Sequence, residues 1–135
     1  MKKFLIFVTR SPFDSLNGQT ALSFCEAAIA LGHEVEHVFF YQQGVQHANV
    51  DIKPASGEKS TLAQWVTFSE QTKTPLNVCV TASIKRGVLS VEDASYMQSH
   101  SNVHPAFTPV GMAEYFAALN TCASSDADSL ICMQF

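Results

Sequence analysis

The chain has 135 residues, of which 47% are hydrophobic and 15% charged, and its formal net charge at pH 7 is −4. This length is enough for one folded domain over residues 1–135 and excludes two full domains. The hydrophobicity excludes a disordered chain, and the acidic balance without basic clusters argues against a dedicated nucleic-acid surface.

The low share of charged residues also bears on assembly. Soluble domains typically contain about 25% charged residues, and this chain has only 15%, together with ten phenylalanines. We therefore expect other chains to cover part of the surface.

The amino terminus carries a short apolar run, Phe4 to Val8, after Lys2 and Lys3. Thr9 and Arg10 end the run after five residues, far short of the roughly 20 that a membrane helix requires. No small-residue cleavage site follows. We expect no signal peptide and a cytoplasmic location, where thiols stay reduced.

Along the chain, short apolar runs alternate with helical periods. The expected strands are residues 4–8, 35–41, 76–80 and 130–135. The first expected helix runs from Asn17 and ends at Gly32, and the second begins after a capping residue, Ser60. The third is expected to begin at Thr108-Pro109, with an apolar face of Val110, Ala113, Phe116, Ala117 and Leu119.

Two regions between these elements lack a clear period. Residues 42–59 are polar and are expected to form a long loop. Residues 82–107 allow a short helical turn at 83–87 and a helix after Ser90. The alternation as a whole predicts an α/β fold: a mostly parallel sheet in a flavodoxin-like three-layer sandwich, with helices on both faces.

In folds of this kind ligands bind beyond the carboxyl ends of the strands. Those ends are expected at Thr9-Arg10, Tyr41-Gln42 and Cys79-Val80-Thr81. A cysteine at this edge is a candidate nucleophile, because a helix expected to start at Ala82-Ser83, with Lys85 and Arg86 in its first turn, favours a thiolate. We expect its sulfur to be reachable from solvent. The alternative is a core residue, since free cysteines are among the most buried side chains.

The other cysteines have less to suggest chemistry, and no CxxC pair indicates a zinc site or a disulfide scaffold. Cys25 lies on the apolar stripe of the first helix, Cys132 is expected to pack within the last strand, and Cys122 is expected to follow the last helix.

Among the histidines, His47 in the long loop is the one candidate to assist the chemistry of the cysteine. His100 and His104 have a metal-like spacing, but Asn102 and Pro105 favour a loop and no carboxylate completes a set, so no metal is expected. His33 and His37 are expected at the surface or at an edge. The chain has no GxGxxG and no GxxxxGK[ST] motif for phosphate.

Several segments, in order along nearly the whole chain, resemble the DsrE/DsrF-like sulfurtransferases, and among these the TusD-type branch. The most telling is Leu76–Val80 with Cys79, followed by Arg86-Gly87-Val88. The other resembling segments are Val38–Tyr41, Gly44-Val45, Ala48-Asn49, Pro54–Ser56 and Gln134-Phe135. The stretch from 121 to 130 departs from the family pattern.

The resemblance implies a function and partners. Members of this branch carry sulfur as a persulfide on the cysteine that matches Cys79, between a TusA-like donor and a TusE-like acceptor, toward 2-thiolation of a tRNA wobble uridine. They assemble with TusB-like and TusC-like subunits into a hexamer, and no cofactor is implied; an isolated chain can form homo-oligomers.

Around Cys79 we expect the backbone N–H groups of Thr81, Ala82 and Ser83 to hold the anionic persulfide, with Lys85 or Arg86 assisting. The 42–59 loop, with Gly44, His47 and Asn49, is expected to wall the site. Three alternatives stay open: a DsrE-type subunit of sulfur oxidation, a non-catalytic assembly subunit in which Cys79 is packing, and a small flavin- or nucleotide-binding domain.

Overall fold

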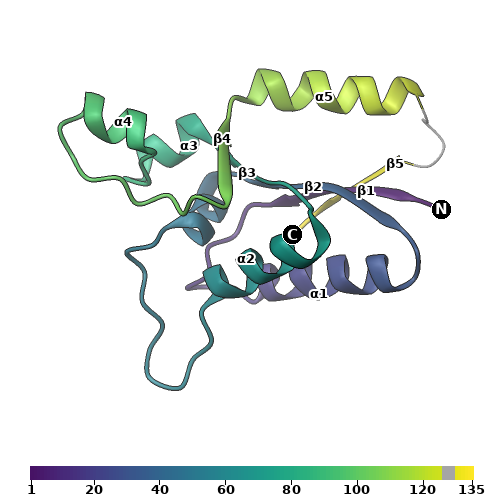
Figure 1. The fold of residues 1–135 in the computed structure, drawn as a ribbon, viewed down its shortest axis with the longest axis horizontal. Helices are drawn as coiled ribbons and strands as arrows, with labels where there is room; N and C mark the ends of the chain where they lie inside the picture. The colour runs from purple at the N-terminus through teal and green to yellow at the C-terminus, as the bar shows by residue number, and fades with distance from the viewer. Residues whose placement is uncertain (126–129) are drawn as a thin grey trace.

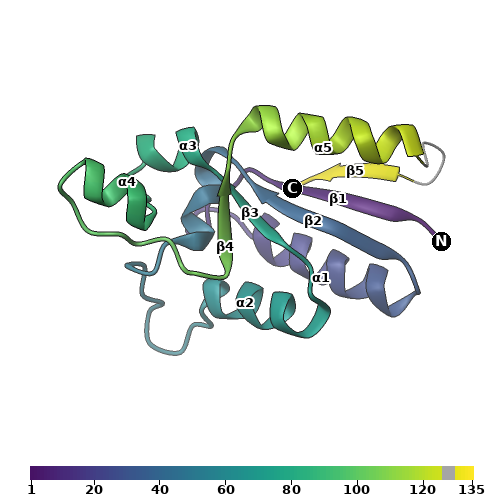
Figure 2. The same cartoon turned by 45° about the horizontal axis from the view of Figure 1, so that its top comes forward.

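A five-stranded parallel sheet organises the protein. The computed structural model describes residues 1–125 and 130–135 and orders the strands β4-β3-β2-β1-β5 (Figures 1 and 2). Each neighbouring pair runs parallel, which confirms the α/β prediction. The strands are β1 (Lys3–Val8), β2 (Glu34–Phe40), β3 (Leu76–Cys79), β4 (Phe107–Val110) and β5 (Leu130–Gln134).

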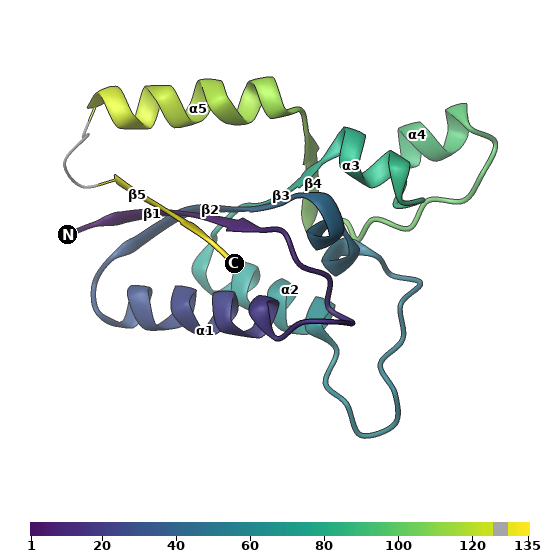
Figure 3. The ribbon, with the colours of Figure 1, turned by 180° about the vertical axis from the view of Figure 1, so that it is seen from behind.

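Helices cover both faces, as predicted. The helices α1 (Asn17–Ala30) and α2 (Thr61–Thr72) lie on one face, and α5 (Met112–Ser125) lies on the other (Figures 1 and 3). Three short elements gather at one end of the sheet: the 3₁₀ helix η1 (Gln42–Ala48), α3 (Val80–Lys85) and α4 (Val91–Tyr96). No helix in residues 1–125 is long and apolar enough to cross a bilayer.

Aromatic contacts fill both layers of the core. Toward α2, the ring of Phe40 meets Trp65 edge to face at 5.2 Å between centroids. Toward α5, Phe39 packs on Tyr115 at 4.4 Å. Because both faces of the sheet are covered, Phe4–Val8 of β1 is apolar throughout rather than alternating, as the sequence predicts, and β2 becomes continuously apolar at Val38–Phe40.

The predicted helix boundaries are largely confirmed. Gly32 follows α1 at φ +84°, a left-handed conformation that glycine adopts without a steric penalty. The Ser60 hydroxyl caps α2 by accepting from the Ala63 N–H at 3.2 Å. Ser90 caps α4 in the same way, accepting from the Asp93 N–H.

The prediction of a helix from Thr108-Pro109 is wrong. Both residues lie in β4, and α5 begins only at Met112. Proline is tolerated there because β4 is an edge strand, so its missing N–H interrupts no ladder on the outer side. The buried face of α5 also differs: Tyr115 is buried, whereas Phe116 is half exposed.

Three smaller differences concern the loops. Residues 42–48 form η1, so the irregular part of the predicted 42–59 loop begins only after Ala48. The helix expected at Ala82-Ser83 begins at Val80. Of the stretch from 121 to 130 that departs from the family pattern, residues 126–129 lie outside the described part of the chain.

The helix η1 docks directly on the carboxyl end of β1. The Val8 carbonyl accepts from the Tyr41 N–H at 2.9 Å, and Gly44 N–H bonds back to the Tyr41 carbonyl. A Cβ at Gly44 would overlap the Val8 carbonyl oxygen, so only glycine permits this approach. The docking holds η1 against β2, β3, α2 and α3.

His47 is the buried polar residue of η1, at 1% exposure. Its Nε2 lies 3.1 Å from the Arg10 carbonyl oxygen, and its ring packs on Phe40 and Trp65. Burial lowers the pKa of His47 from 6.5 to about 4. The imidazole is therefore neutral in the fold at neutral pH, with its proton on Nε2 toward the carbonyl.

We predict that Gly44→Ala lowers the free energy of unfolding by roughly 2–4 kcal/mol, because the added methyl group meets backbone that cannot rotate away. Urea unfolding measures the change. Gly111→Ala is the matched control, since a Cβ there meets nothing within 4 Å. Equal midpoints for the two variants would contradict the close approach of η1 to β1.

We also predict an acid-sensitive contribution from His47. Below its ordinary pKa of 6.5 the unfolded chain takes up a proton here, and the folded chain does not until about pH 4. The stabilisation is thus complete above pH 6.5 and is lost as the pH falls toward 4, at up to about 1.4 kcal/mol per unit.

Urea midpoints measured across that window test this prediction. His47→Gln, which keeps a donor for the Arg10 carbonyl, is expected to be less stable at pH 7 but flatter with pH. Burial also lowers the pKa of His37, so this residue contributes to the pH dependence in the same direction. His37→Gln is therefore measured as a second variant, to separate the two contributions. A slope unchanged in His47→Gln would contradict the assignment.

Candidate functional site

Cys79 lies where the sequence predicts it, at the carboxyl end of β3. It is the last residue of the strand and the N-cap residue of α3, with an extended backbone at φ −68° and ψ 122°. The chain passes from strand to helix without an intervening loop. The Cys79 side chain makes no capping hydrogen bond, so the first N–H groups of α3 have no side-chain acceptor from this position.

The Cys79 side chain is buried, at 1% exposure. The expectation that its sulfur is reachable from solvent is therefore wrong for the isolated chain. Cys79 belongs to the hydrophobic core cluster, and β4 pairs with β3 on its outer side with Val110 opposite Cys79. With β2 on the other side, β3 is an interior strand.

The residues after Cys79 divide into buried and exposed ones. Ala82 and Ser83 are buried, and the Ser83 hydroxyl has no hydrogen-bond partner. Thr81 is exposed. An unpaired buried hydroxyl costs free energy. Ser83 follows Cys79 by one helical turn, so its hydroxyl is available to bond a polar group carried on Cys79.

The two cationic residues lie at the opposite end of α3 from Cys79. Six helical residues at about 1.5 Å each separate the helix ends by about 9 Å. Arg86 Nη1 donates to the Ala82 carbonyl at 3.1 Å, and its Nε is buried without a partner. Lys85 is exposed. In this conformation the Arg86 side chain closes the carboxyl end of α3.

The three predicted wall residues are in or next to η1, which contacts both β3 and α3. Gly44 is fixed against β1, and His47 turns toward the Arg10 carbonyl, as described above. Asn49 shapes the following turn: its Oδ1 accepts from the Asp51 N–H at 2.9 Å, and its Nδ2 donates to Gln46.

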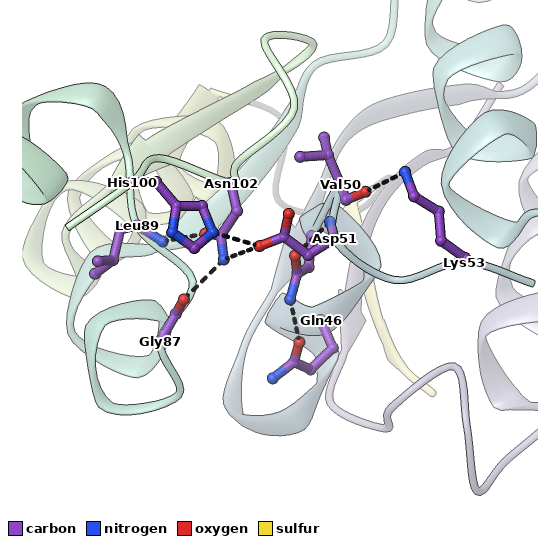
Figure 4. Close-up of polar contacts among 9 residues, drawn as sticks. Gln46, Val50, Asp51, Lys53, Gly87, Leu89, His100 and Asn102 are labelled. Carbon is purple, nitrogen blue, oxygen red and sulfur yellow. Dashed lines mark hydrogen bonds and ion pairs between the residues drawn. The ribbon is translucent and has the colours of Figure 1, made fainter.

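A polar cluster that the sequence did not reveal ties this turn to the segment after α3 (Figure 4). Asn102 is buried, and its Oδ1 accepts from the Leu89 N–H at 2.6 Å. Its Nδ2 donates to the Gly87 carbonyl at 2.9 Å and to Asp51 Oδ2 at 3.1 Å. We call Asn102 and these three partners the Asn102 clasp.

His100 completes the cluster. Its Nε2 lies 2.8 Å from Asp51 Oδ2. The hydrogen bonds from His100 and then Asn102 lower the pKa of Asp51. The clasp joins residues far apart in sequence, so no local pattern could have indicated it; the only signal was an Asn in a polar stretch.

The other cysteines separate by burial. Cys25 is fully buried as predicted, and burial raises the pKa of its thiol to about 12. The prediction that Cys132 packs is wrong, because β5 is an edge strand and Cys132 is exposed. Cys122 lies within α5 rather than after it, and its side chain is outside the described part of the structure.

The remaining histidines differ in their surroundings. His100 and His104 are both outside helices, as predicted, and no group of three or more ligating side chains gathers among the described residues. His33 accepts from the Lys2 N–H near the surface. The prediction for His37 is wrong: it lies in the interior strand β2, and its ring packs against Tyr115 at 5.3 Å.

Comparison with known proteins agrees with this architecture. Residues 2–124 match the model of the DsrE/DsrF-like family. Over 98% of this chain and 100% of the other, the fold superimposes on the crystal structure of the ychN protein from E. coli, with a TM-score of 0.70 at 17% identity.

Curated relatives point to the same family. "Sulfurtransferase TusD" of Pectobacterium carotovorum is 32% identical over 123 residues, covering 90% of this chain and 95% of the relative. "Sulfurtransferase TusD" of Salmonella dublin is 34% identical over 121 residues, covering 89% and 94%. These relatives support assignment of the protein to the sulfurtransferases, in the transferase class, and the chain belongs to the DsrE/DsrF-like family.

Proposed function

We propose that this protein transfers sulfur as a persulfide carried on Cys79. The observation that carries the proposal is the position of Cys79, at a strand's carboxyl end and at the start of a helix, in a chain whose relatives are named sulfurtransferases. Among the cysteines whose side chains are described, Cys79 alone lies at this edge of the sheet; Cys25 is in the middle of α1 and Cys132 in β5.

The proposed chemistry is thiol exchange in two steps. The Cys79 thiolate attacks the outer sulfur of a donor persulfide, the donor's S–S bond breaks, and the donor leaves as a thiolate. An acceptor thiolate then attacks the outer sulfur on Cys79, whose own thiolate leaves. Each step forms one S–S bond and breaks one, so no external oxidant or reductant is required.

The start of α3 is the proposed cradle for the terminal sulfur. The N–H groups of Thr81 and Ala82 lie in the first turn, where a helix favours negative charge, and the unpaired Ser83 hydroxyl is a further donor. Arg86 and Lys85 contribute long-range positive charge from the far end of α3. Gly44, His47 and Asn49 act through η1, by fixing the wall against which β3 and α3 pack.

Burial of Cys79 means that transfer requires a local opening. We propose that the segment from Arg86 to Ala106 moves, because the Asn102 clasp holds the chain at Gly87 and Leu89, directly after α3. Docking of a donor or acceptor would supply the free energy for this movement. The proposed partners are TusA-like and TusE-like carriers and TusB-like and TusC-like subunits, in the cytoplasm.

The proposed destination of the sulfur is the wobble uridine of tRNA, with a DsrE-type role in sulfur oxidation as the alternative. The 1% exposure of Cys79 favours a second candidate function. In that case the protein is a non-catalytic assembly subunit, and Cys79 fills the core at the end of β3.

We predict that incubation with glutathione persulfide adds one sulfur atom, about 32 Da, to the intact chain and that Cys79→Ser abolishes the addition. Cys132→Ser, which removes an exposed thiol, is the matched control and should retain the added mass. Intact-protein and peptide mass spectrometry read the result. Sulfur found on Cys132 with none on Cys79 would leave only the assembly role.

The local opening makes its own prediction. Asn102→Ala removes the clasp, and we expect it to raise the rate at which N-ethylmaleimide labels Cys79 by about tenfold or more, equivalent to about 1.4 kcal/mol. Ser101→Ala, at the exposed neighbouring residue, should leave the rate unchanged.

Cys25 is the internal reference for global unfolding, because it is a fully buried residue of α1, which lies away from the Asn102 clasp. Labelling at each cysteine is followed by peptide mass spectrometry. If Asn102→Ala accelerates Cys25 and Cys79 equally, the opening is global, and the proposed role of the clasp is wrong.

A further inference from the structure

A cavity of about 750 Å³ lies on the other side of η1 from α3. It is bounded by the turn between β1 and α1, the end of η1, and the irregular segment that leads into α2. The amino ends of α1 and α2 lie at the same end of the molecule, next to that segment (Figure 3). This volume is within the range of small-molecule sites, about 300–1,000 Å³.

Two helices present unpaired N–H groups to this cavity. Ser15 Oγ accepts from Asn17 N–H at the start of α1, which leaves the N–H groups of Gly18 and Gln19 without acceptors in the described part of the chain. At the start of α2, the N–H groups of Thr61 and Leu62 are left in the same way.

All four of these residues line the cavity, and neither helix has an acidic residue in its first turn. Two partial positive charges therefore converge on one space, an arrangement that favours an anionic group.

Two buried polar atoms on the cavity wall lack partners. His47 lines the cavity at 1% exposure, and its Nδ1 has no hydrogen bond. The Gln64 carboxamide oxygen is buried without a partner on the same wall. Since Nε2 of His47 donates to the Arg10 carbonyl, Nδ1 is an acceptor. Both atoms are suited to a ligand that donates from hydroxyl or amino groups.

The charged side chains around the cavity balance one another. Lys53 and Lys59 line it together with Asp14 and Glu58. Asp14 accepts from the Ser11 hydroxyl and Glu58 from the Ala55 N–H, so both carboxylates have donors within the protein. The charged side chains of the wall therefore do not by themselves favour an anion, and the preference for an anion comes from the amino ends of α1 and α2.

Apolar side chains stand at the mouth with nothing covering them. Phe13 is 63% exposed and Leu16 is 77% exposed, and both line the cavity. Exposed apolar side chains next to a polar cradle are typical of a site that takes a flat, partly apolar body.

We propose that this cavity binds a phosphate-bearing ligand of mononucleotide size. The phosphate lies against the N–H groups at the starts of α1 and α2, hydroxyl or amino groups of the ligand donate to His47 Nδ1 and Gln64, and the ring system packs on Phe13 and Leu16. This binding site is separate from Cys79 and goes beyond the proposed sulfur transfer.

The test is titration of the ¹⁵N-labelled full chain with AMP, with adenosine and inorganic phosphate as separate arms. We expect AMP to bind with a Kd of the order of 0.1–1 mM and each fragment at least about tenfold more weakly. The amides of Gly18, Gln19, Thr61 and Leu62 should shift most in the AMP arm. Phosphate alone moving the same four amides as tightly as AMP would replace the nucleotide by a simple oxyanion and overturn the proposal.

Two leucines give a matched pair of variants. Leu16 and Leu31 flank the two ends of α1 at 77% and 76% exposure, and only Leu16 lines this cavity. Leu16→Ala should weaken AMP binding by about fivefold or more, and Leu31→Ala by less than about twofold. Equal affinities for the two variants, or no amide shift with AMP at about 10 mM, would overturn the proposal.

Discussion

The contact on which the functional end of this protein depends is the docking of η1 onto the carboxyl end of β1. It is made of backbone against backbone, with Gly44 directly against the Val8 carbonyl. From there η1 contacts β3 and α3 on one side and α2 on the other. The same seven-residue helix therefore supports the Cys79 junction and forms part of the wall of the cavity that His47 lines. A side chain at position 44 would disturb both.

Position in the fold, and not burial, distinguishes Cys79 from Cys25. Cys25 is held among apolar side chains in the α1 layer, where loss of hydration raises the pKa of its thiol to about 12 and keeps it inert. Cys79 is as inaccessible as Cys25, but it ends a strand and begins a helix, so the proposed local rearrangement would admit water to it without opening the sheet. In the proposed reaction, a persulfide on Cys79 would be protected from other thiols, which would otherwise remove its outer sulfur.

The sequence predicts most of the fold because β1 and the second half of β2 are covered on both faces and appear as continuous apolar runs. Ser60, Ser90 and Gly32 add local start and stop signals for the helices. It fails at β4, where Thr108-Pro109 has the local pattern of a helix start and the edge of the sheet decides otherwise. The expectation that Cys79 is reachable from solvent rested on its place at the carboxyl end of a strand, and it is wrong because Cys79 is part of the core. The Asn102 clasp and the cavity escaped prediction for another reason: their members come from distant parts of the chain.

The segment that leads from α3 to β4 reconciles the buried Cys79 thiol with the proposed transfer reaction. Its apolar anchors are few: Val88, Leu89 and Ala94 are buried, whereas Val91, Tyr96 and Met97 of α4 and its end are exposed. Its remaining attachments to the turn after η1 are polar. They are the Asn102 side chain, the exposed pair of His100 with Asp51, and a backbone bridge between Asn49 and Val103. Next to this bridge the Val50 N–H donates to the Asn102 carbonyl and the His104 N–H donates to the Ala48 carbonyl. Polar attachments near solvent exchange for water at a small net cost, about 0.5–1.5 kcal/mol each, whereas separating β3 from β2 would break the core. The lowest-energy opening next to Cys79 is therefore release of this segment, and a partner that binds the exposed side of α4 is well placed to bring it about.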